Sequence, residues 1–216
     1  MQPADALTHA LPVVEAAATL AFAASGLVAG ARKKLDVVGL CVVTTLAAFG
    51  GGTLRDVLLD RRPFYWVEHA VWLWVILGLC IAATFVLRKR GLATQLAITE
   101  RAIQWPDALG LGLFTAVGTQ LALTQNLPPI VAVLMGVITA VFGGVLRDIA
   151  CNEVPKVFSD HQPYAVCAFF GGWVAVAGHQ LSWPSEASLA ASALVTCVLR
   201  VAAMVSGLKL PGWRGQ

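Results

Sequence analysis

The chain has 216 residues, of which 58% are hydrophobic and only 12% are charged, and its mean hydropathy is +0.76. Soluble domains carry about 25% charged residues, so this composition argues against a soluble domain and indicates an integral membrane protein. The formal net charge of +3, without any long Lys/Arg run, argues against nucleic acid as a partner. The cysteines and histidines show no metal-ligand spacing, so no metal site is predicted.

Seven apolar segments have about the 20 residues that a helix needs to cross the hydrocarbon core of a bilayer. The N-terminus lacks a basic segment, so the first of them is expected to be a membrane span and not a cleaved signal peptide. We therefore predict an all-α integral membrane protein, with residues 1–216 forming one membrane domain. The predicted spans are 11–30, 37–59, 68–87, 103–124, 129–150, 162–181 and 187–208.

Basic residues follow spans one, three and seven, which places them on one side of a seven-span chain. By the positive-inside rule this side is cytoplasmic, so a multi-pass protein of the cell (inner) membrane is expected, with its N-terminus outside and its C-terminus in the cytoplasm. Arg61 and Arg62 run against the rule, but Asp60 and Glu68 flank them. The residues that set the orientation are Arg32, Lys33, Lys34, Arg88, Lys89, Arg90, Lys209 and Arg214.

Two segments of the chain repeat a motif, "LAAFGGGTLRDVLLD" at 46–60 and "ITAVFGGVLRDIACN" at 138–152. The spacing of 92 residues also relates positions in spans one and four, so the repeat spans three helices. An odd number of spans inverts the second copy, which predicts an inverted repeat at 8–92 and 100–184, followed by a seventh helix at 187–208. The matched pairs are Glu15/Asp107, Phe22/Phe114, Gly26/Gly118, Gly51/Gly143, Gly52/Gly144, Leu54/Leu146, Arg55/Arg147, Asp56/Asp148 and Pro63/Pro155.

Glycines lie in the middle of spans two and five, at Gly50, Gly51 and Gly52 and at Gly143 and Gly144. Because glycine has no side chain and adopts unusual backbone conformations easily, these positions are predicted to kink or interrupt both helices. The freed carbonyl oxygens would suit a cation. Thr53-x-x-Asp56 has the spacing of a capping box at the start of a second half-helix. The alternative is that the glycines only permit close helix packing.

Arg55, Asp56, Arg147 and Asp148 follow the glycines, and charges at this depth usually face a cavity or a partner. Since adjacent residues on a helix do not face each other, we expect partners on other spans. The repeat suggests the pairs Glu15–Arg55 and Asp107–Arg147, which would line or gate the outer and inner halves of one conduit. Alternatively, these pairs only hold helices together. Polar candidates along the conduit are Thr53, Ser25, Thr44, Thr45, Thr119 and Thr139.

Two copies of Gly-Gly-x-Leu-Arg-Asp in a seven-span inverted repeat resemble the prokaryotic members of the trimeric intracellular cation (TRIC) channel family. The resemblance implies a homotrimer with one pore in each protomer, beside kinked helices two and five, that passes monovalent cations, mainly potassium. It places Gly50–Gly52 at the first kink, Gly143 and Gly144 at the second, and the Arg-Asp pairs at the charged positions. Animal relatives carry lysine at the first kink, so their lysine-based lipid contacts do not transfer to this chain.

The sequence is also compatible with functions other than a channel. Relatives with the same repeated domain are described as glycine transporters, so a secondary transporter of a small solute such as glycine is the alternative to a channel. The sequence has no Gly-x-Ser-x-Gly, His-Glu-x-x-His or nucleotide-binding motif, so an enzyme is not expected. A purely structural membrane protein is the third possibility. Expected partners are membrane lipids and monovalent cations, with no cofactor apart from permeant potassium or sodium.

Overall fold

A computed structural model describes residues 3–89, 100–159 and 162–209, and these residues contain helices and no β-strand. The all-α prediction is therefore confirmed for the described part of the chain. Arg90, Arg214 and the end of the first predicted repeat, 90–92, lie outside it. The helices are α1 (Pro3–Arg32), α2 (Val37–Leu58), α3 (Tyr65–Glu68), α4 (Val71–Lys89), α6 (Glu100–Thr124), α7 (Pro129–Ala150), α8 (Lys156–Ser159), α9 (Ala165–Gln180) and α10 (Ser185–Ser206).

Each predicted span coincides with one long helix of the described residues, namely α1, α2, α4, α6, α7, α9 and α10. Four of these helices, α1 from Ala10 onward, α2, α7 and α10, have the length and apolar composition needed to cross a membrane. The apolar part of α4, Val71–Val86, is shorter. Four helices are therefore clear membrane spans by length and composition.

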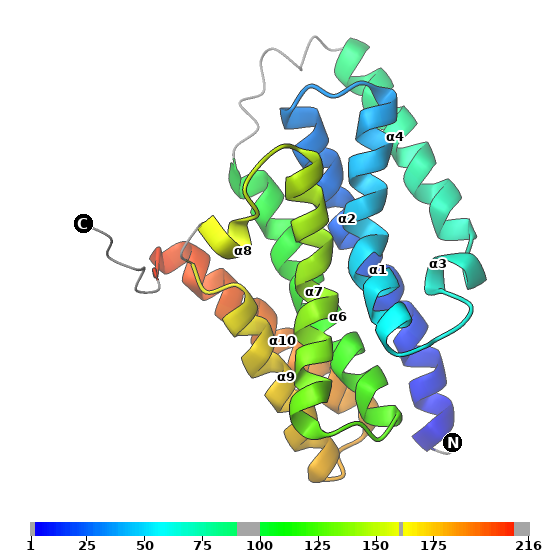
Figure 1. The fold of residues 1–216 in the computed structure, drawn as a ribbon, viewed down its shortest axis with the longest axis vertical. Helices are drawn as coiled ribbons and strands as arrows, with labels where there is room; N and C mark the ends of the chain where they lie inside the picture. Colours follow the sequence, from blue (N-terminus) through cyan, green and yellow to red (C-terminus); the bar gives the residue numbers. More distant parts are fainter. Residues whose placement is uncertain (1–2, 90–99, 160–161, 210–216) are drawn as a thin grey trace.

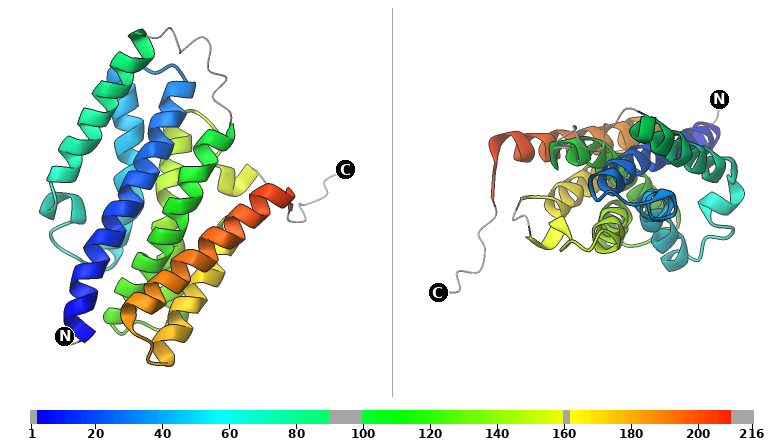
Figure 2. Two further views of the ribbon diagram at one scale, coloured as in Figure 1. Left: turned by 180° about the vertical axis from the view of Figure 1, so that it is seen from behind. Right: turned by 90° about the horizontal axis from the view of Figure 1, so that it is seen from above.

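Helices α1, α2, α6 and α7 form the centre of the molecule, where α6 packs on α1 and α7, and α2 packs on the same two helices. Helices α1 and α6 run in opposite directions, as do α2 and α7 (Figure 1). Helices α9 and α10 cover one side of this centre, and α4 stands at the opposite edge beside α2 (Figure 2). The rings of Phe22 and Phe114 stack with centroids 5.6 Å apart where α1 meets α6. Two residues that the repeat relates thus meet at the centre.

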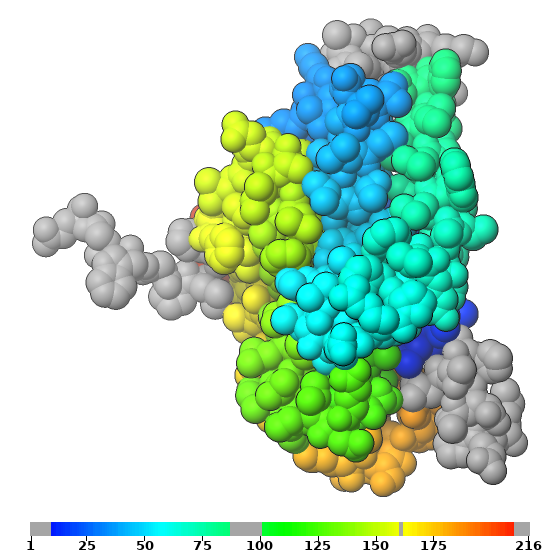
Figure 3. Space-filling view, turned by 45° about the vertical axis from the view of Figure 1, so that its right-hand side comes forward, coloured from blue at the N-terminus to red at the C-terminus, as the bar shows by residue number. Residues whose placement is uncertain are grey.

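The short connections gather at the two ends of this bundle. At one end, Lys33 after α1 forms an ion pair of 2.9 Å with Glu153 after α7. At the other end, Gln125 after α6 donates a hydrogen bond of 3.2 Å to the Leu59 carbonyl oxygen after α2. The space-filling view shows the segment that contains α3 lying over this end of α2, beside the start of α4 (Figure 3). The two Arg-Asp motifs therefore lie toward opposite ends of the bundle.

Both glycine-containing helices are continuous through their glycines, so an interruption of spans two and five is wrong, while a kink at these glycines stays a prediction. A Cβ atom on Gly51 would collide with the Thr139 carbonyl oxygen of α7, and one on Gly143 would collide with the Ala47 carbonyl oxygen of α2. The glycines thus let the two backbones touch, as small residues do between membrane helices. An unbroken helix keeps its backbone groups hydrogen-bonded, which the absence of water in a bilayer favours.

The predicted capping box at Thr53 is also wrong. The Thr53 hydroxyl donates a hydrogen bond of 2.8 Å to the Phe49 carbonyl oxygen, one turn earlier in the same helix. Asp56 instead accepts a hydrogen bond of 3.1 Å from the Tyr65 backbone N–H, beyond the end of α2. Because α2 does not restart after the glycines, it has no free N–H groups there for a cap to bind.

Candidate functional site

The first cluster of buried charges, which we call the Arg55 network, consists of Arg55, Asp56 and Glu15. Arg55 Nη2 donates to Glu15 Oε1, and Arg55 Nε and Nη2 lie 2.9 and 2.7 Å from Asp56 Oδ1. All three side chains are at most 2% exposed. The predicted pairing of Glu15 with Arg55 is confirmed. Arg55 also pairs with Asp56, a contact that was not expected, because the long arginine side chain folds back onto its neighbour.

The second cluster, which we call the Arg147 network, consists of Arg147, Asp148 and Asp107 together with Ser25. Arg147 Nη1 donates to both Asp107 Oδ1 and Ser25 Oγ. Arg147 Nε donates to Asp148 Oδ1 at 2.9 Å, as Arg55 does to Asp56. The predicted pair Asp107–Arg147 is therefore also confirmed. Both networks place one buried arginine between a carboxylate on a neighbouring helix and the carboxylate next in sequence.

The two helices that carry the arginines end in the same way, which explains why the local structures match. The backbone N–H of Arg61 donates to the Asp56 carbonyl oxygen at 2.8 Å, and that of Glu153 donates to the Asp148 carbonyl oxygen at 2.9 Å. The residues just before, Asp60 and Asn152, have positive φ angles of 50° and 54°. Aspartate and asparagine tolerate this left-handed conformation better than most residues. Beyond each helix end, a backbone N–H donates to the second oxygen of the aspartate side chain, from Tyr65 to Asp56 Oδ2 and from Lys156 to Asp148 Oδ2.

The formal charges of the two networks have the same sign. Each contains two carboxylates and one guanidinium, so each carries a formal charge of −1 when all groups are ionised. Breaking a buried ion pair by removing one partner costs about 3–5 kcal/mol, because the remaining charge loses its compensation. In the Arg55 network, Arg61 Nη1 adds positive charge 3.4 Å from Glu15 Oε2 and 3.6 Å from Asp56 Oδ1, on a side chain that is 28% exposed. With Arg61 included, the formal charges at the first site sum to zero.

Two residues of the second site were not identified from the sequence. The Tyr164 hydroxyl donates a hydrogen bond of 2.7 Å to Asp107 Oδ2. The Arg200 guanidinium lies 4.9 Å from the centroid of the Tyr164 ring, and Arg200 Nη1 donates to the Pro163 carbonyl oxygen at 3.1 Å. Arg200 connects α10 to the Arg147 network through Tyr164. A single arginine in the apolar sequence of span seven was the available signal, since such a charge requires a partner.

We expect Tyr164→Phe to destabilise the protein by about 2 kcal/mol, because Asp107 loses a buried hydrogen bond to a charged group. Thermal unfolding of the purified protein in detergent measures this. Tyr65→Phe is the matched control, since the Tyr65 hydroxyl makes only a long hydrogen bond of 3.4 Å to the Pro12 carbonyl oxygen. Burial raises the pKa of Tyr65 far above its ordinary value, so its hydroxyl stays protonated. Equal destabilisation by the two substitutions would contradict this assignment.

The six polar candidates lie in four different surroundings. Ser25 belongs to the Arg147 network. Thr139 donates to the Met135 carbonyl oxygen at 2.6 Å, while the buried hydroxyls of Thr44 and Thr119 have no hydrogen-bond partner among the described residues. Thr45 and Thr53 are half-buried and line a groove on the surface of α2. The structure therefore does not gather these hydroxyls into one polar row.

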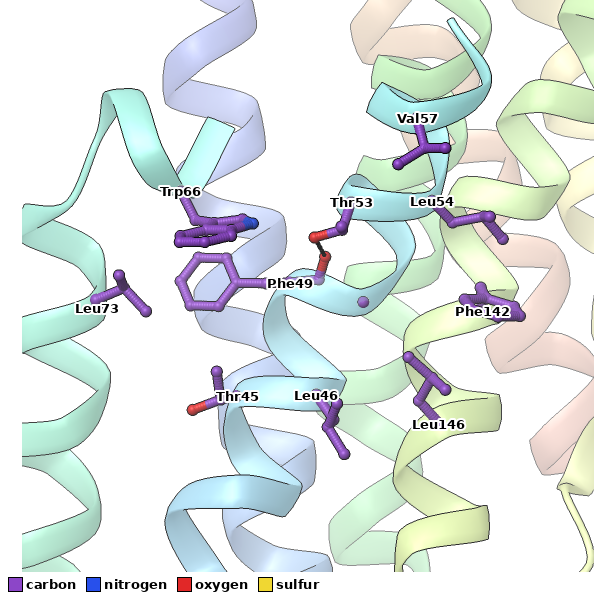
Figure 4. Close-up of a pocket in the computed structure, with 11 residues that line it drawn as sticks. Thr45, Leu46, Phe49, Thr53, Leu54, Val57, Trp66, Leu73, Phe142 and Leu146 are labelled. Atoms are coloured by element: carbon purple, nitrogen blue, oxygen red, sulfur yellow. Dashed lines mark hydrogen bonds between the residues drawn. The ribbon is translucent and has the colours of Figure 1, made fainter. Parts of the chain in front are cut away.

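The groove has a volume of about 430 Å³ and lies between α2, α3, α4 and α7, and its lining is almost entirely apolar (Figure 4). It offers no charged group, so it is a poor site for a cation. Beside each network lies a much smaller cavity of about 10 Å³, one lined by Glu15, Gly52 and Tyr65 and the other by Gly144, Arg147 and Tyr164. A space of this size holds about one water molecule. Both charge networks are thus nearly closed.

Comparison with known proteins shows which family has this arrangement. The family model described as glycine transporter matches two segments of the chain, residues 12–88 and 104–180, and the second begins 92 residues after the first. The UPF0126 membrane protein of Vibrio cholerae is 32% identical over 208 residues, which cover 94% of this chain and 83% of that protein. The UPF0126 inner membrane protein YadS of Escherichia coli K12 is 33% identical over 198 residues, covering 89% and 91%.

Solved structures of similar proteins share the fold as well. The TRIC trimeric intracellular cation channel orthologue from Rhodobacter sphaeroides superposes with a TM-score of 0.83 at 31% identity, over 92% of this chain and 99% of that one. A structure described as the basis for conductance through TRIC cation channels gives a TM-score of 0.79 at 32% identity, over 94% and 97%. The chain therefore belongs to the prokaryotic TRIC family of membrane proteins, and its two matched segments correspond to the domain that the glycine transporter model describes.

Proposed function

We propose that this protein is a membrane channel that conducts monovalent cations, mainly potassium, along a path through each protomer past the Arg55 and Arg147 networks. The observation that best supports the proposal is the fold shared with TRIC cation channels, combined with two buried networks in which two carboxylates bind one arginine. The orthologue from Rhodobacter sphaeroides is described as trimeric, and we extend this to a homotrimer here.

The proposed topology has seven crossings of the cell (inner) membrane and an outside N-terminus. Helices α1–α4 form the first copy of an inverted repeat and α6–α9 form the second, with α10 as the seventh crossing. The antiparallel arrangement of α2 and α7 supports this topology, because it puts one Arg-Asp motif toward each end of the bundle. A cation that crosses the protein then meets one network in each half of the membrane.

The proposed mechanism follows from the charges and from the burial of the two networks. Each arginine is bound by its carboxylates and fills the space that a cation would use, so the geometry described above is a closed state. A cation passes when the arginine separates from Glu15 or Asp107 and leaves the carboxylates to face the ion. No filter of the Thr-Val-Gly-Tyr-Gly kind is present in the sequence, so we expect weak discrimination between potassium and sodium.

Recording from the purified protein in planar bilayers tests the proposal. We expect discrete unitary currents in symmetrical potassium chloride, and none from bilayers treated with detergent alone. In parallel, proteoliposomes are assayed for uptake of labelled glycine, the solute in the description of the family model. Saturable glycine uptake without unitary currents would contradict the channel and favour a secondary transporter.

A further inference from the structure

The two networks differ at one position of an otherwise repeated arrangement. In the Arg147 network, the Ser25 hydroxyl of α1 accepts a hydrogen bond from Arg147 Nη1. The residue 92 positions later is Val117 of α6, which is fully buried and has no polar side-chain atom. Arg55 Nη1 has no hydrogen-bond partner among the described residues, although the side chain is fully buried. Arg147 is thus bound by the Ser25 hydroxyl, whereas Arg55 has no corresponding hydroxyl among the described residues.

Packing shows that Ser25 and Val117 occupy corresponding places. Each is followed by a glycine, Gly26 or Gly118, that lies against the neighbouring helix of its own half. The closest neighbours are Thr44 and Ala47 of α2 for Gly26, and Gly136 and Thr139 of α7 for Gly118. These two sets are again 92 residues apart. Val117 therefore occupies the same position relative to the Arg55 network that Ser25 occupies relative to the Arg147 network.

The carboxylates that face the two arginines are held with unequal strength. Asp107 receives a second hydrogen bond of 2.7 Å from the Tyr164 hydroxyl, and Arg200 of α10 lies against the ring of that tyrosine. The second oxygen of Glu15 is contacted by Arg61 Nη1 at 3.4 Å, from a side chain that is 28% exposed. Helix α10 packs on α6 and α9, on the side of the molecule away from α4 (Figure 2). The added partner of Asp107 is thus the buried Tyr164, whereas Arg61, the added partner of Glu15 and Asp56, is partly exposed.

We propose that the Arg55 network is the gate that opens first, and that Ser25, Tyr164 and Arg200 are positioning residues that hold the Arg147 network closed more firmly. This inference rests on the proposed function. Opening of the first network breaks no hydrogen bond between the arginine and a hydroxyl, whereas opening of the second separates Arg147 from Ser25. Arg61, which is partly exposed, withdraws toward solvent as Arg55 leaves Glu15. The carboxylates of Glu15 and Asp56 then face the incoming cation. Val117 sets the asymmetry, since it supplies no acceptor to Arg55.

The substitution Val117→Thr tests this directly, because threonine has nearly the shape of valine and adds the missing hydroxyl. One hydrogen bond to a charged group corresponds to roughly a tenfold change or more in an equilibrium constant. We expect Val117→Thr to lower the open probability in planar bilayers about tenfold, with the unitary conductance retained. Val133→Thr, at a fully buried valine of α7 outside both networks, is the matched control and should leave the open probability unchanged. If Val117→Thr does not assemble, Val117→Ser supplies the same hydroxyl with less bulk.

A second measurement does not depend on current. Gly52→Cys and Gly144→Cys place a thiol beside the first and the second network, where an added Cβ atom comes no closer than 3.8 and 3.2 Å to neighbouring atoms. A water-soluble thiol reagent is added to both sides of proteoliposomes, and the wild-type chain corrects for its five cysteines. We expect Gly52→Cys to react at least about fivefold faster than Gly144→Cys, and Val117→Thr to slow its reaction about tenfold.

Equal rates at the two positions, or rates and open probabilities that Val117→Thr leaves unchanged, would overturn the inference. These results are distinguishable from a failure of the proposed function. If the wild-type protein gives no unitary currents, the channel proposal fails, while the labelling rates still decide which network opens first. If the wild type conducts and Val117→Thr behaves as Val133→Thr does, the channel stands and the assignment of the gate is wrong.

Discussion

Gly51→Ala is expected to destabilise the protein by about 3 kcal/mol, at the upper end of the usual cost of overpacking a core. The added methyl group would collide with the Thr139 carbonyl oxygen, which is part of a helix backbone and cannot rotate away. Helices α2 and α7 must therefore move apart at the point where both halves of the molecule meet. Thermal unfolding in detergent measures the loss of stability, and bilayer recording measures the accompanying loss of current.

Gly78→Ala on α4 is the matched control for this prediction, since no atom lies within 4 Å of the position of an added Cβ at Gly78. Alanine is also the better helix former by about 0.5–1 kcal/mol, so this variant should be at least as stable as the wild type. Gly143→Ala should behave like Gly51→Ala, because its Cβ would meet the Ala47 carbonyl oxygen. Wild-type stability in Gly51→Ala and Gly143→Ala would show that the helices do not touch here.

Arg147→Met is the second substitution from which we expect a large effect, a loss of about 3–5 kcal/mol of stability. Methionine fills a similar volume but leaves Asp107 and Asp148 buried without the cation that both contact. Arg147→Lys should lie in between, because lysine keeps the charge but cannot bind two carboxylates with a planar group. Chemical or thermal unfolding of the detergent-solubilised proteins ranks the stabilities of the wild type, Arg147→Lys and Arg147→Met.

An exposed arginine provides the comparison for Arg147→Met. Arg101, near the start of α6, is exposed to the surroundings, and Arg101→Met should change stability by no more than about 0.5 kcal/mol. If Arg147→Met costs as little as Arg101→Met, the buried network does not hold the fold. If it is fully stable and also conducts normally, the network has no part in the function either.

The helices and the two ion pairs were predictable because both depend on simple rules. A run of about 20 apolar residues specifies a membrane helix almost by itself, and the four helices that are long and apolar enough to cross a membrane lie in such runs. The pairs Glu15–Arg55 and Asp107–Arg147 followed from the 92-residue repeat, since a buried charge requires a partner and the repeat supplies one for each arginine. The role of these residues in permeation stays a prediction.

The sequence could not decide between the two interpretations of the glycine motif, because glycine serves two physical purposes. Glycine permits both a broken helix and close contact between two unbroken helices, and the sequence of one helix does not show what lies opposite. Here the neighbouring backbone at Thr139 and Ala47 decides the outcome. Tyr164 and Arg200 were missed for a related reason. Their contacts join Asp107 of α6 to the residue before α9 and to α10, which lies outside the repeat, and among the described residues they have no equivalent in the first half.

The most direct test of a path through each protomer is to place a charged group beside the Arg55 network while current is recorded. The chain Gly52→Cys is exposed to a positively charged thiol reagent in a planar bilayer. If each protomer of a trimer has its own path beside Glu15, the current falls in equal discrete steps, one for each protomer. A current that stays unchanged after mass spectrometry has verified complete modification would contradict the account, because the ions would then cross elsewhere.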